Sequence, residues 1–224
     1  MPTRDLLMCS ALIVAATAAA VGAGEITIAH VGIVLDAPPS FSERRLATMA
    51  EETAAIWRPY GVTITWLTPL REPEPGPADV RVVVRMPLSP HGRRTAGALE
   101  PSLGSVVFVD GIPDGVITIR PETVEAAILA ARWNGRSFTE APWGIQEDFA
   151  GRALGRVLAH ELGHYLLAQK SHTQTGLMRA TFKGRELVAT DRRAFQLQPR
   201  DLAALGTRLA QFMATSPGSP GFQP

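Results

Sequence analysis

Cysteine is almost absent from this chain of 224 residues, since Cys9 is its only example. Cys9 lies inside an N-terminal apolar segment that has the character of a signal peptide, so the processed protein would contain no thiol at all. Disulfide bonds are therefore excluded, and so is the class of disulfide-rich extracellular domains. Any metal site in the processed chain must be built from histidine, aspartate or glutamate.

An excess of charge of either sign is also missing. The chain has 22 Lys and Arg against 21 Asp and Glu, which gives a formal net charge of +1. The sequence contains no basic stripe, so we expect no nucleic-acid partner. It contains no second long apolar run after the N-terminal one, so we expect no membrane association once that segment is removed.

Residues 1–23 have the pattern of a secretory signal peptide. Arg4 gives a basic start, an apolar stretch follows, and small residues lead to Ala20 and Ala23. This order predicts a secreted or periplasmic protein, cleaved after Ala23 or after Ala20. The processed chain of about 200 residues is long enough to form one domain with a hydrophobic core.

The pattern between the two ends predicts a single α+β domain over residues 24–213, followed by a disordered Pro/Gly/Ser-rich tail over 214–224. Alternating apolar and β-branched residues predict strands at 25–35, 62–67, 79–86, 105–109 and 116–120. Helical periodicity and capping residues predict helices at 42–58, 121–132, 146–169 and 198–212. We expect a twisted mixed sheet of about five strands packed on two long helices. That N-terminal subdomain (24–170) precedes a small, mostly helical C-terminal subdomain (171–213).

The motif His160-Glu161-Leu162-Gly163-His164 lies on the predicted helix 146–169. Two histidines four residues apart on a helix point the same way, so their ring nitrogens can meet on one metal ion. Glu161 is adjacent to the first histidine and can reach a water at the metal without being a ligand. This is the HExxH arrangement of zinc hydrolases, and it predicts Zn²⁺ with Glu161 as the general base.

A third protein ligand is needed, because catalytic zinc takes three and keeps one position for water. His172 requires the shortest path back from His164, through a polar and turn-rich segment. Glu186 and Asp191 are the alternatives, although each needs a longer path and a return helix. We therefore predict that His160, His164 and His172 bind the metal.

Together with Gly176-Leu177-Met178, these residues resemble the metzincin clan of zinc peptidases. In that clan the third histidine follows a glycine turn, and a turn containing methionine lies beneath the metal. The resemblance is close over residues 146–180 and weak over 25–180, where only the order of strands and helices carries it. It implies a zincin-like fold and a zinc endopeptidase that acts on peptides or proteins. Together with the signal-peptide pattern, this predicts an exported peptidase, which we expect to be a monomer.

The chain departs from the clan at two positions. The spacing from His164 to His172 is eight residues, where the clan has six, and Leu167 replaces a glycine. No tyrosine follows Tyr165 to stabilise an oxyanion, and Arg179 is a candidate substitute. Two other functions remain open: a gluzincin- or aspzincin-like peptidase with Glu186 or Asp191 as the third ligand, and a non-catalytic zinc-bound binding domain. Glu161 argues against the second, because a purely structural zinc site has no use for a base.

Overall fold

The computed structural model describes residues 29–67, 80–87 and 102–215, with side chains as far as residue 211. The predicted signal peptide, residues 1–23, and residues 216–224 of the predicted tail lie outside the described residues. Export, the disorder of those tail residues and the division into two subdomains therefore stay predictions.

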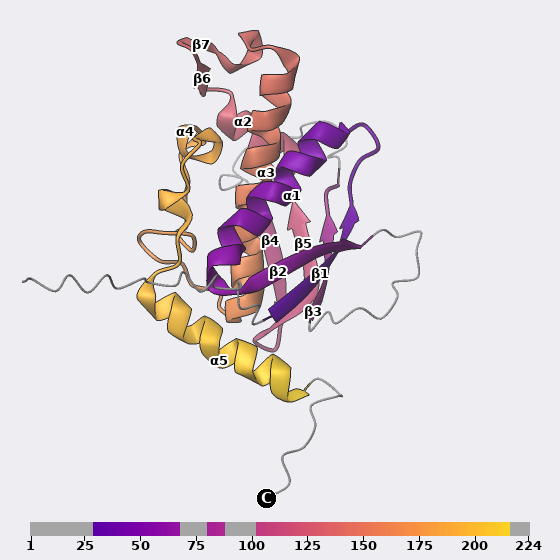
Figure 1. Ribbon diagram of the computed structural model, residues 1–224, viewed down its shortest axis with the longest axis vertical. Helices are drawn as coiled ribbons and strands as arrows, with labels where there is room; N and C mark the ends of the chain where they lie inside the picture. The colour runs from indigo at the N-terminus through magenta and orange to yellow at the C-terminus, as the bar shows by residue number, and fades with distance from the viewer. Residues whose placement is uncertain (1–28, 68–79, 88–101, 216–224) are drawn as a thin grey trace, which may run out of the picture.

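Five strands form one mixed sheet in the order β2-β1-β3-β5-β4 (Figure 1). The strands are β1 (Ala29–Asp36), β2 (Val62–Leu67), β3 (Val80–Arg85), β4 (Gly104–Val109) and β5 (Ile112–Ile119). The pairs β1–β2, β1–β3 and β3–β5 are parallel, whereas β4 runs antiparallel to β5 and ends the sheet at one side. The predicted mixed sheet of about five strands is confirmed, and β4 is an edge strand of the described sheet.

The hairpin between β4 and β5 is tighter than the sequence predicts. The expected connection covered residues 110–115, but the turn consists of Asp110 and Gly111, and Ile112 already belongs to β5. Both turn residues have positive φ, at 51° and 82°. Two consecutive residues with positive φ are typical of a two-residue hairpin turn, whose twist matches that of the strands.

In the described part of the chain, the two long helices predicted to pack on the sheet are present, together with two short helices and a C-terminal helix of 17 residues. The helices are α1 (Glu43–Trp57), α2 (Pro121–Ile128), α3 (Trp143–Leu167), α4 (Gly184–Val188) and α5 (Pro199–Thr215). Ser42 is the N-cap of α1, and its hydroxyl accepts a hydrogen bond from the Arg45 amide at 3.1 Å. Helix α5 includes two residues that the sequence assigned to the tail. The segment after α2 contains a small hairpin, β6 (Arg132–Trp133) and β7 (Arg136–Ser137), where we expected a helix end and a loop.

Helices α1 and α3 cross in close contact, and α3 also packs on β4 and β5 (Figure 1). Two glycines of α3 allow this approach. A Cβ atom at Gly155 would lie 2.7 Å from the carbonyl oxygen of Met49, and one at Gly151 would lie 2.6 Å from that of Arg45. The Thr53 hydroxyl donates to the carbonyl oxygen of Gly155 at 3.1 Å, which fixes the crossing point.

A buried ion pair connects this helix pair to the chain that follows. The Arg156 side chain is fully buried, and its Nε donates to the Glu52 carboxylate at 2.8 Å. Its other nitrogens donate to the backbone carbonyls of Glu186 and Asp191. Breaking a buried pair of this kind typically costs about 3–5 kcal/mol. Arg156 therefore holds the segment after α3 against the two long helices.

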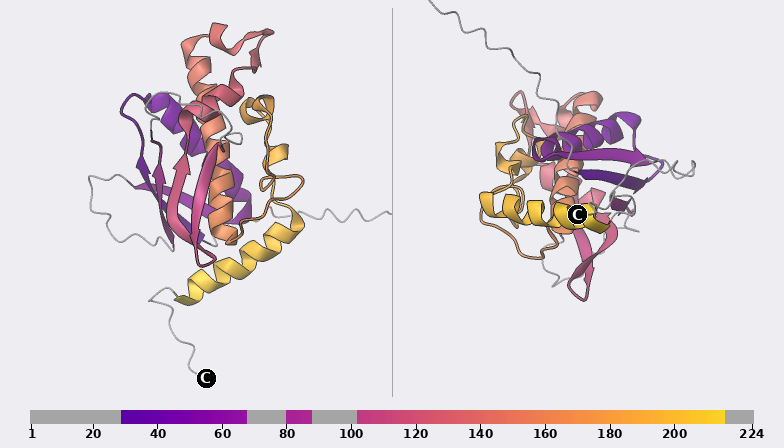
Figure 2. Two further views of the ribbon diagram at one scale, coloured as in Figure 1. Left: turned by 180° about the vertical axis from the view of Figure 1, so that it is seen from behind. Right: turned by 60° about the horizontal axis from the view of Figure 1, so that its bottom comes forward.

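Helix α5 lies across one end of the molecule, opposite the β6–β7 hairpin (Figure 2). Its Leu205 and Leu209 are buried, whereas Leu202 is 41% exposed. In the part of the chain that the structure describes, no helix combines the length and apolar character needed to cross a bilayer.

Candidate metal centre

Helix α3 supplies two of the predicted ligands from its C-terminal half, and the reversal after it supplies the third. The helix ends at Ala168, which has φ 50° and lies in the left-handed region. The amide of Ala168 donates to the carbonyls of His164 and Tyr165, and the amide of Gln169 donates to that of His164. This is a helix-terminating reversal of the kind usually made by glycine. It returns the chain toward α3 and brings His172 beside the helix.

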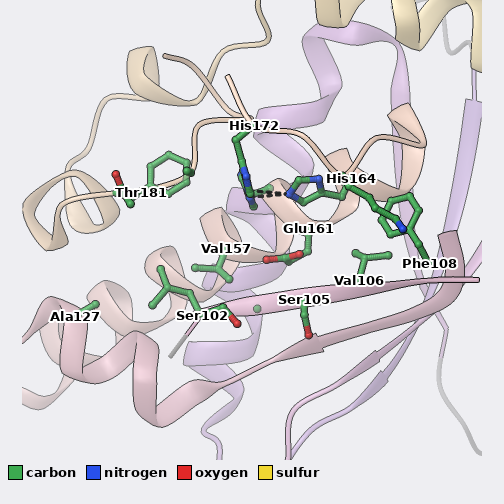
Figure 3. A pocket seen from close by; sticks show the side chains of 16 residues that line it. Ser102, Ser105, Val106, Phe108, Ala127, Val157, Glu161, His164, His172 and Thr181 are labelled. Atoms are coloured by element: carbon green, nitrogen blue, oxygen red, sulfur yellow. Dashed lines mark hydrogen bonds between the residues drawn. The ribbon is translucent and has the colours of Figure 1, made fainter. Parts of the chain in front are cut away.

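The three predicted histidines lie around one point. Figure 3 shows two of them, His164 and His172, facing each other above Glu161. The Nε2 atom of His164 is 3.1 Å from Nε2 of His160 and 3.2 Å from Nε2 of His172. One ligand atom from each ring can be chosen so that all three lie within 4.8 Å of one another. The structure therefore brings together the residues that the sequence proposed as ligands.

Backbone carbonyls set the orientation of the first two rings. His160 Nδ1 lies 2.7 Å from the carbonyl oxygen of Leu177, and His164 Nδ1 lies 2.7 Å from that of Gln169. A carbonyl oxygen only accepts, so each Nδ1 carries the proton and donates it. In the neutral imidazole the lone pair is then on Nε2, the nitrogen that faces the other histidines.

This arrangement fits a metal ion better than a hydrogen-bonded cluster. Two unprotonated nitrogens 3.1 Å apart, those of His160 and His164, cannot hydrogen-bond to each other while both Nδ1 atoms keep their protons. A cation between them removes the repulsion of the two lone pairs. Tetrahedral zinc with nitrogens at about 2.0–2.1 Å needs them roughly 3.3 Å apart, close to the spacing in this site. Imidazole nitrogens are also ligands that zinc prefers.

Burial keeps the histidines in the form that binds a metal. It lowers the pKa of His160 to about 4, although the hydrogen bond to Leu177 acts in the opposite direction. Burial also lowers the pKa of His164 and that of His172. The three rings are therefore neutral at neutral pH, as metal ligation requires.

Glu161 lies next to the histidines, against the backbone of β4. Its side chain is buried, and burial raises its pKa to about 7, opposed by the positive charge of Arg120. Gly104 makes room for the carboxylate, because a Cβ atom there would lie 2.8 Å from Glu161 Oε1. A cation bound at the histidines would favour the ionised carboxylate again. The position and environment of Glu161 suit a group that accepts a proton near neutral pH.

A cleft of about 690 Å³ contains both the histidines and Glu161. Its walls come from the edge strand β4, from α2 and α3, and from the two segments that follow α3: Ser102, Leu103, Gly104, Ser105, Val106, Phe108, Ala127, Val157, Lys170, Ala180, Thr181 and Phe182. A cleft of this volume is in the range of ligand-binding sites. The cleft gives a substrate access to the three histidines and to the Glu161 carboxylate.

The Gly176-Leu177-Met178 segment supports the site from behind. Gly176 has φ 80°, and a Cβ atom there would collide with the carbonyl oxygen of Gln196. Leu177 provides the carbonyl that orients His160. Met178 is buried, and its sulfur fills the space where a side chain at Gly163 would lie. The glycine of the HExxH motif therefore makes room for this methionine.

The alternative ligands lie elsewhere. The Glu186 carboxylate forms an ion pair with Arg179 at 2.8 Å, and the Asp191 carboxylate accepts from the backbone amide of Arg193 at 3.2 Å. Neither carboxylate belongs to the group of converging ligand atoms. Arg179, the candidate oxyanion stabiliser, pairs with Glu186 and packs over the ring of Phe182 at 4.4 Å. It is not among the residues that line the cleft.

Sequence reasoning missed the partners that come from distant parts of the chain. Gly104 shapes the space for Glu161, and Lys170 and Phe108 line the cleft. Phe182 packs edge-on against His160, with 5.6 Å between ring centroids. Of these residues, only Lys170 could have been suggested by the sequence, because it lies two residues before the predicted ligand His172.

No protein-family profile matches this sequence, and no curated protein matches it either. Among solved structures, archaemetzincin from Methanopyrus kandleri is similar, with 14% sequence identity and a TM-score of 0.47. The alignment covers 81% of this chain and 96% of that chain. At this identity and TM-score the likeness assigns no activity to the chain.

Proposed function

We propose that this protein is a zinc-dependent peptidase that uses Glu161 as its general base. One observation carries the proposal: the Nε2 atoms of His160, His164 and His172 converge beside a buried carboxylate in an open cleft. A purely structural zinc site closes its coordination shell with protein ligands, whereas this group has three and faces a cleft. The layout is metzincin-like in its order of two helical histidines, a third after a turn, and a following methionine.

The residues of the chain have distinct roles in this reaction. The three histidines would hold zinc, which supplies Lewis-acid chemistry that lowers the pKa of water and polarises a carbonyl. Glu161 takes a proton from the attacking water as the water oxygen adds to the carbonyl carbon of the peptide bond. Glu161 then gives that proton to the amine nitrogen as the carbon–nitrogen bond breaks. The edge strand β4 can pair with an extended peptide and hold it in the cleft.

Two alternatives are less well supported. A layout with Glu186 or Asp191 as the third ligand would require either carboxylate to leave its partner, Arg179 or the Arg193 amide. A non-catalytic zinc-bound domain would have no use for a carboxylate beside the ligands, or for the space that Gly104 leaves for it. The first alternative also leaves the orientation of His172 toward His164 without a role.

We expect purified protein to bind one zinc ion per chain and to unfold at a lower temperature once a chelator removes it. Ligand binding to the folded state stabilises it by about 2.7 kcal/mol when free ligand is at 100 times its dissociation constant. Metal analysis and thermal unfolding with and without zinc measure both effects. Magnesium is the control, because it prefers oxygen ligands and should leave the unfolding temperature unchanged. Equal unfolding temperatures with zinc and with magnesium would count against the site.

Replacing Gly104 by Ala should reduce peptide hydrolysis roughly tenfold while zinc binding is retained. The added Cβ would displace the Glu161 carboxylate, and a misplacement of about 1 Å can cost about 100-fold in rate. The measurements are kcat/KM for peptide hydrolysis and zinc content, in the variant and in the wild type. Gly115→Ala on the neighbouring strand β5 is the matched control, because its Cβ would make only an ordinary 3.6 Å contact. Equal rates for both variants would show that the space at Gly104 does not matter.

The proposed peptidase acts outside the cytoplasm. This part of the proposal is supported by the signal-peptide pattern of residues 1–23. N-terminal sequencing of protein recovered from the periplasm or medium should begin at Gly24 or Val21. Soluble cytoplasmic protein that keeps Met1 would contradict export and leave the metal chemistry unaffected.

A further inference from the structure

The two ends of the cleft differ in chemistry (Figure 3). Phe108 lies at one end, and Ala127 and Thr181 lie at the other, with Glu161, His164 and His172 between them. Lys170 accompanies Phe108, because its ammonium nitrogen is 5.2 Å from the centre of that ring. Among the described residues that line the cleft, Lys170 is the only ionisable one apart from Glu161 and the histidines.

The ammonium of Lys170 has no anionic partner in the described part of the chain. Its one interaction there is with the face of Phe108. A cation over an aromatic ring gains about 0.5–1 kcal/mol at an exposed site, and the contact leaves the other side of the ammonium open to an anion. The backbone of Lys170 is held close to the centre, because its neighbour Gln169 accepts the hydrogen bond of His164 and His172 follows two residues later. Lys170 therefore presents a positive charge at a fixed end of the cleft.

No ionisable side chain among the described residues lines the opposite end. Arg179 lies over the ring of Phe182 but pairs with Glu186, and Arg120 donates to the Ser102 hydroxyl. Val157 is buried there, and Phe182 stacks on Phe195 with 4.9 Å between ring centroids and an interplanar angle of 12°. Phe182 also contacts His160 edge-on. The described side chains that line this end are apolar or, like those of Thr181 and Ser102, polar and uncharged. A carboxylate placed here would lose water without meeting an unpaired cation among the residues that line this end, which is unfavourable.

We propose that Lys170 binds a carboxylate of the peptide substrate at the Phe108 end of the cleft. The inference rests on the proposed peptidase function and names the substrate class: peptides with a negative charge on one side of the cleaved bond. The carboxylate belongs either to an acidic side chain or to the C-terminus of the peptide. Side chains of an extended peptide alternate between its two faces, so one position of the substrate should meet Lys170.

The test uses zinc-loaded full-length protein and peptides that carry Glu, Gln or Lys at each position around one cleavage site. Wild-type protein should cleave the Glu peptide roughly two- to fivefold faster than the Gln peptide, in line with exposed ion pairs, at positions on one side only. In Lys170→Met the Glu-to-Gln ratio should fall to about one, and in Lys170→Glu the Lys peptide should become the preferred one. Lys183→Met is the matched control, since Lys183 does not line the cleft, and it should keep the wild-type ratio.

Two further arms identify the source and nature of the effect. Peptides with a free or an amidated C-terminus distinguish a terminal carboxylate from an acidic side chain. Raising the salt concentration should shrink the preference, because salt screens exposed charges. A wild-type ratio of one at every position and at both kinds of C-terminus, or a ratio unchanged in Lys170→Met, would overturn the assignment of Lys170. Failure of the wild-type protein to cleave any peptide would instead overturn the peptidase function, and the inference with it.

Discussion

Replacing Glu161 by Gln is expected to lower kcat/KM for peptide hydrolysis by about 10² to 10⁴-fold, the usual contribution of a general base. Glutamine has nearly the same shape as glutamate but cannot take a proton from water. Glu161 lies beside the histidines, and its carboxylate is not part of the group of three converging ligand atoms. The variant should therefore keep its zinc and its fold. Zinc content and thermal unfolding, measured beside the rate, show whether the loss is chemical.

The matched control for this variant is Glu51→Gln, an exposed glutamate on α1 that takes no part in the site. It should cleave at the wild-type rate. A Glu161→Gln protein that binds zinc and hydrolyses peptides as fast as wild type would show that another group is the base. A variant that loses its zinc would point to a ligand role for Glu161, which the arrangement of the three histidines does not give it.

Local signals in the sequence were enough to predict most helices and strands. Ser42 caps α1 because its hydroxyl reaches an amide within the same turn, and Pro121 opens α2 because its missing amide is not needed there. The extent of β5 could not be predicted in this way. Gly115 and Pro113 are residue types typical of loops, yet both lie in β5, which pairs with β3 on one side and β4 on the other. Tertiary pairing overrides local preference at these positions.

In the candidate site, too, some residue positions follow from local sequence and others depend on tertiary contacts. The helical spacing of His160 and His164 makes them neighbours in any α-helix, so the sequence alone places them together. The reversal that brings in His172 depends on Ala168 in a left-handed conformation, which its residue type does not predict. Gly104 belongs to β4 and lies more than fifty positions before Glu161 in the sequence. No periodicity within one element reports a contact of that kind.

Replacing His172 by Ala should weaken zinc binding by more than the roughly 10- to 100-fold that follows loss of a group that only orients a ligand. His172 faces His164 with 3.2 Å between their Nε2 atoms, and its removal leaves two protein donors where catalytic zinc takes three. Hydrolysis should be lost with the metal. The measurement is zinc affinity by competition with a chelator, since it separates loss of the ligand from loss of chemistry.

The carboxylate variants Glu186→Gln and Asp191→Asn decide between the possible third ligands. Glu186 pairs with Arg179, so Glu186→Gln should leave zinc affinity near the wild-type value, even if the loss of the pair lowers stability slightly. Asp191→Asn removes charge from a largely exposed side chain whose partners are the backbone amide and side chain of Arg193. If either carboxylate variant loses zinc while His172→Ala keeps it, the third ligand is a carboxylate. The metzincin-like layout would then be wrong, because the histidine after the turn is the residue that distinguishes it from a gluzincin- or aspzincin-like peptidase.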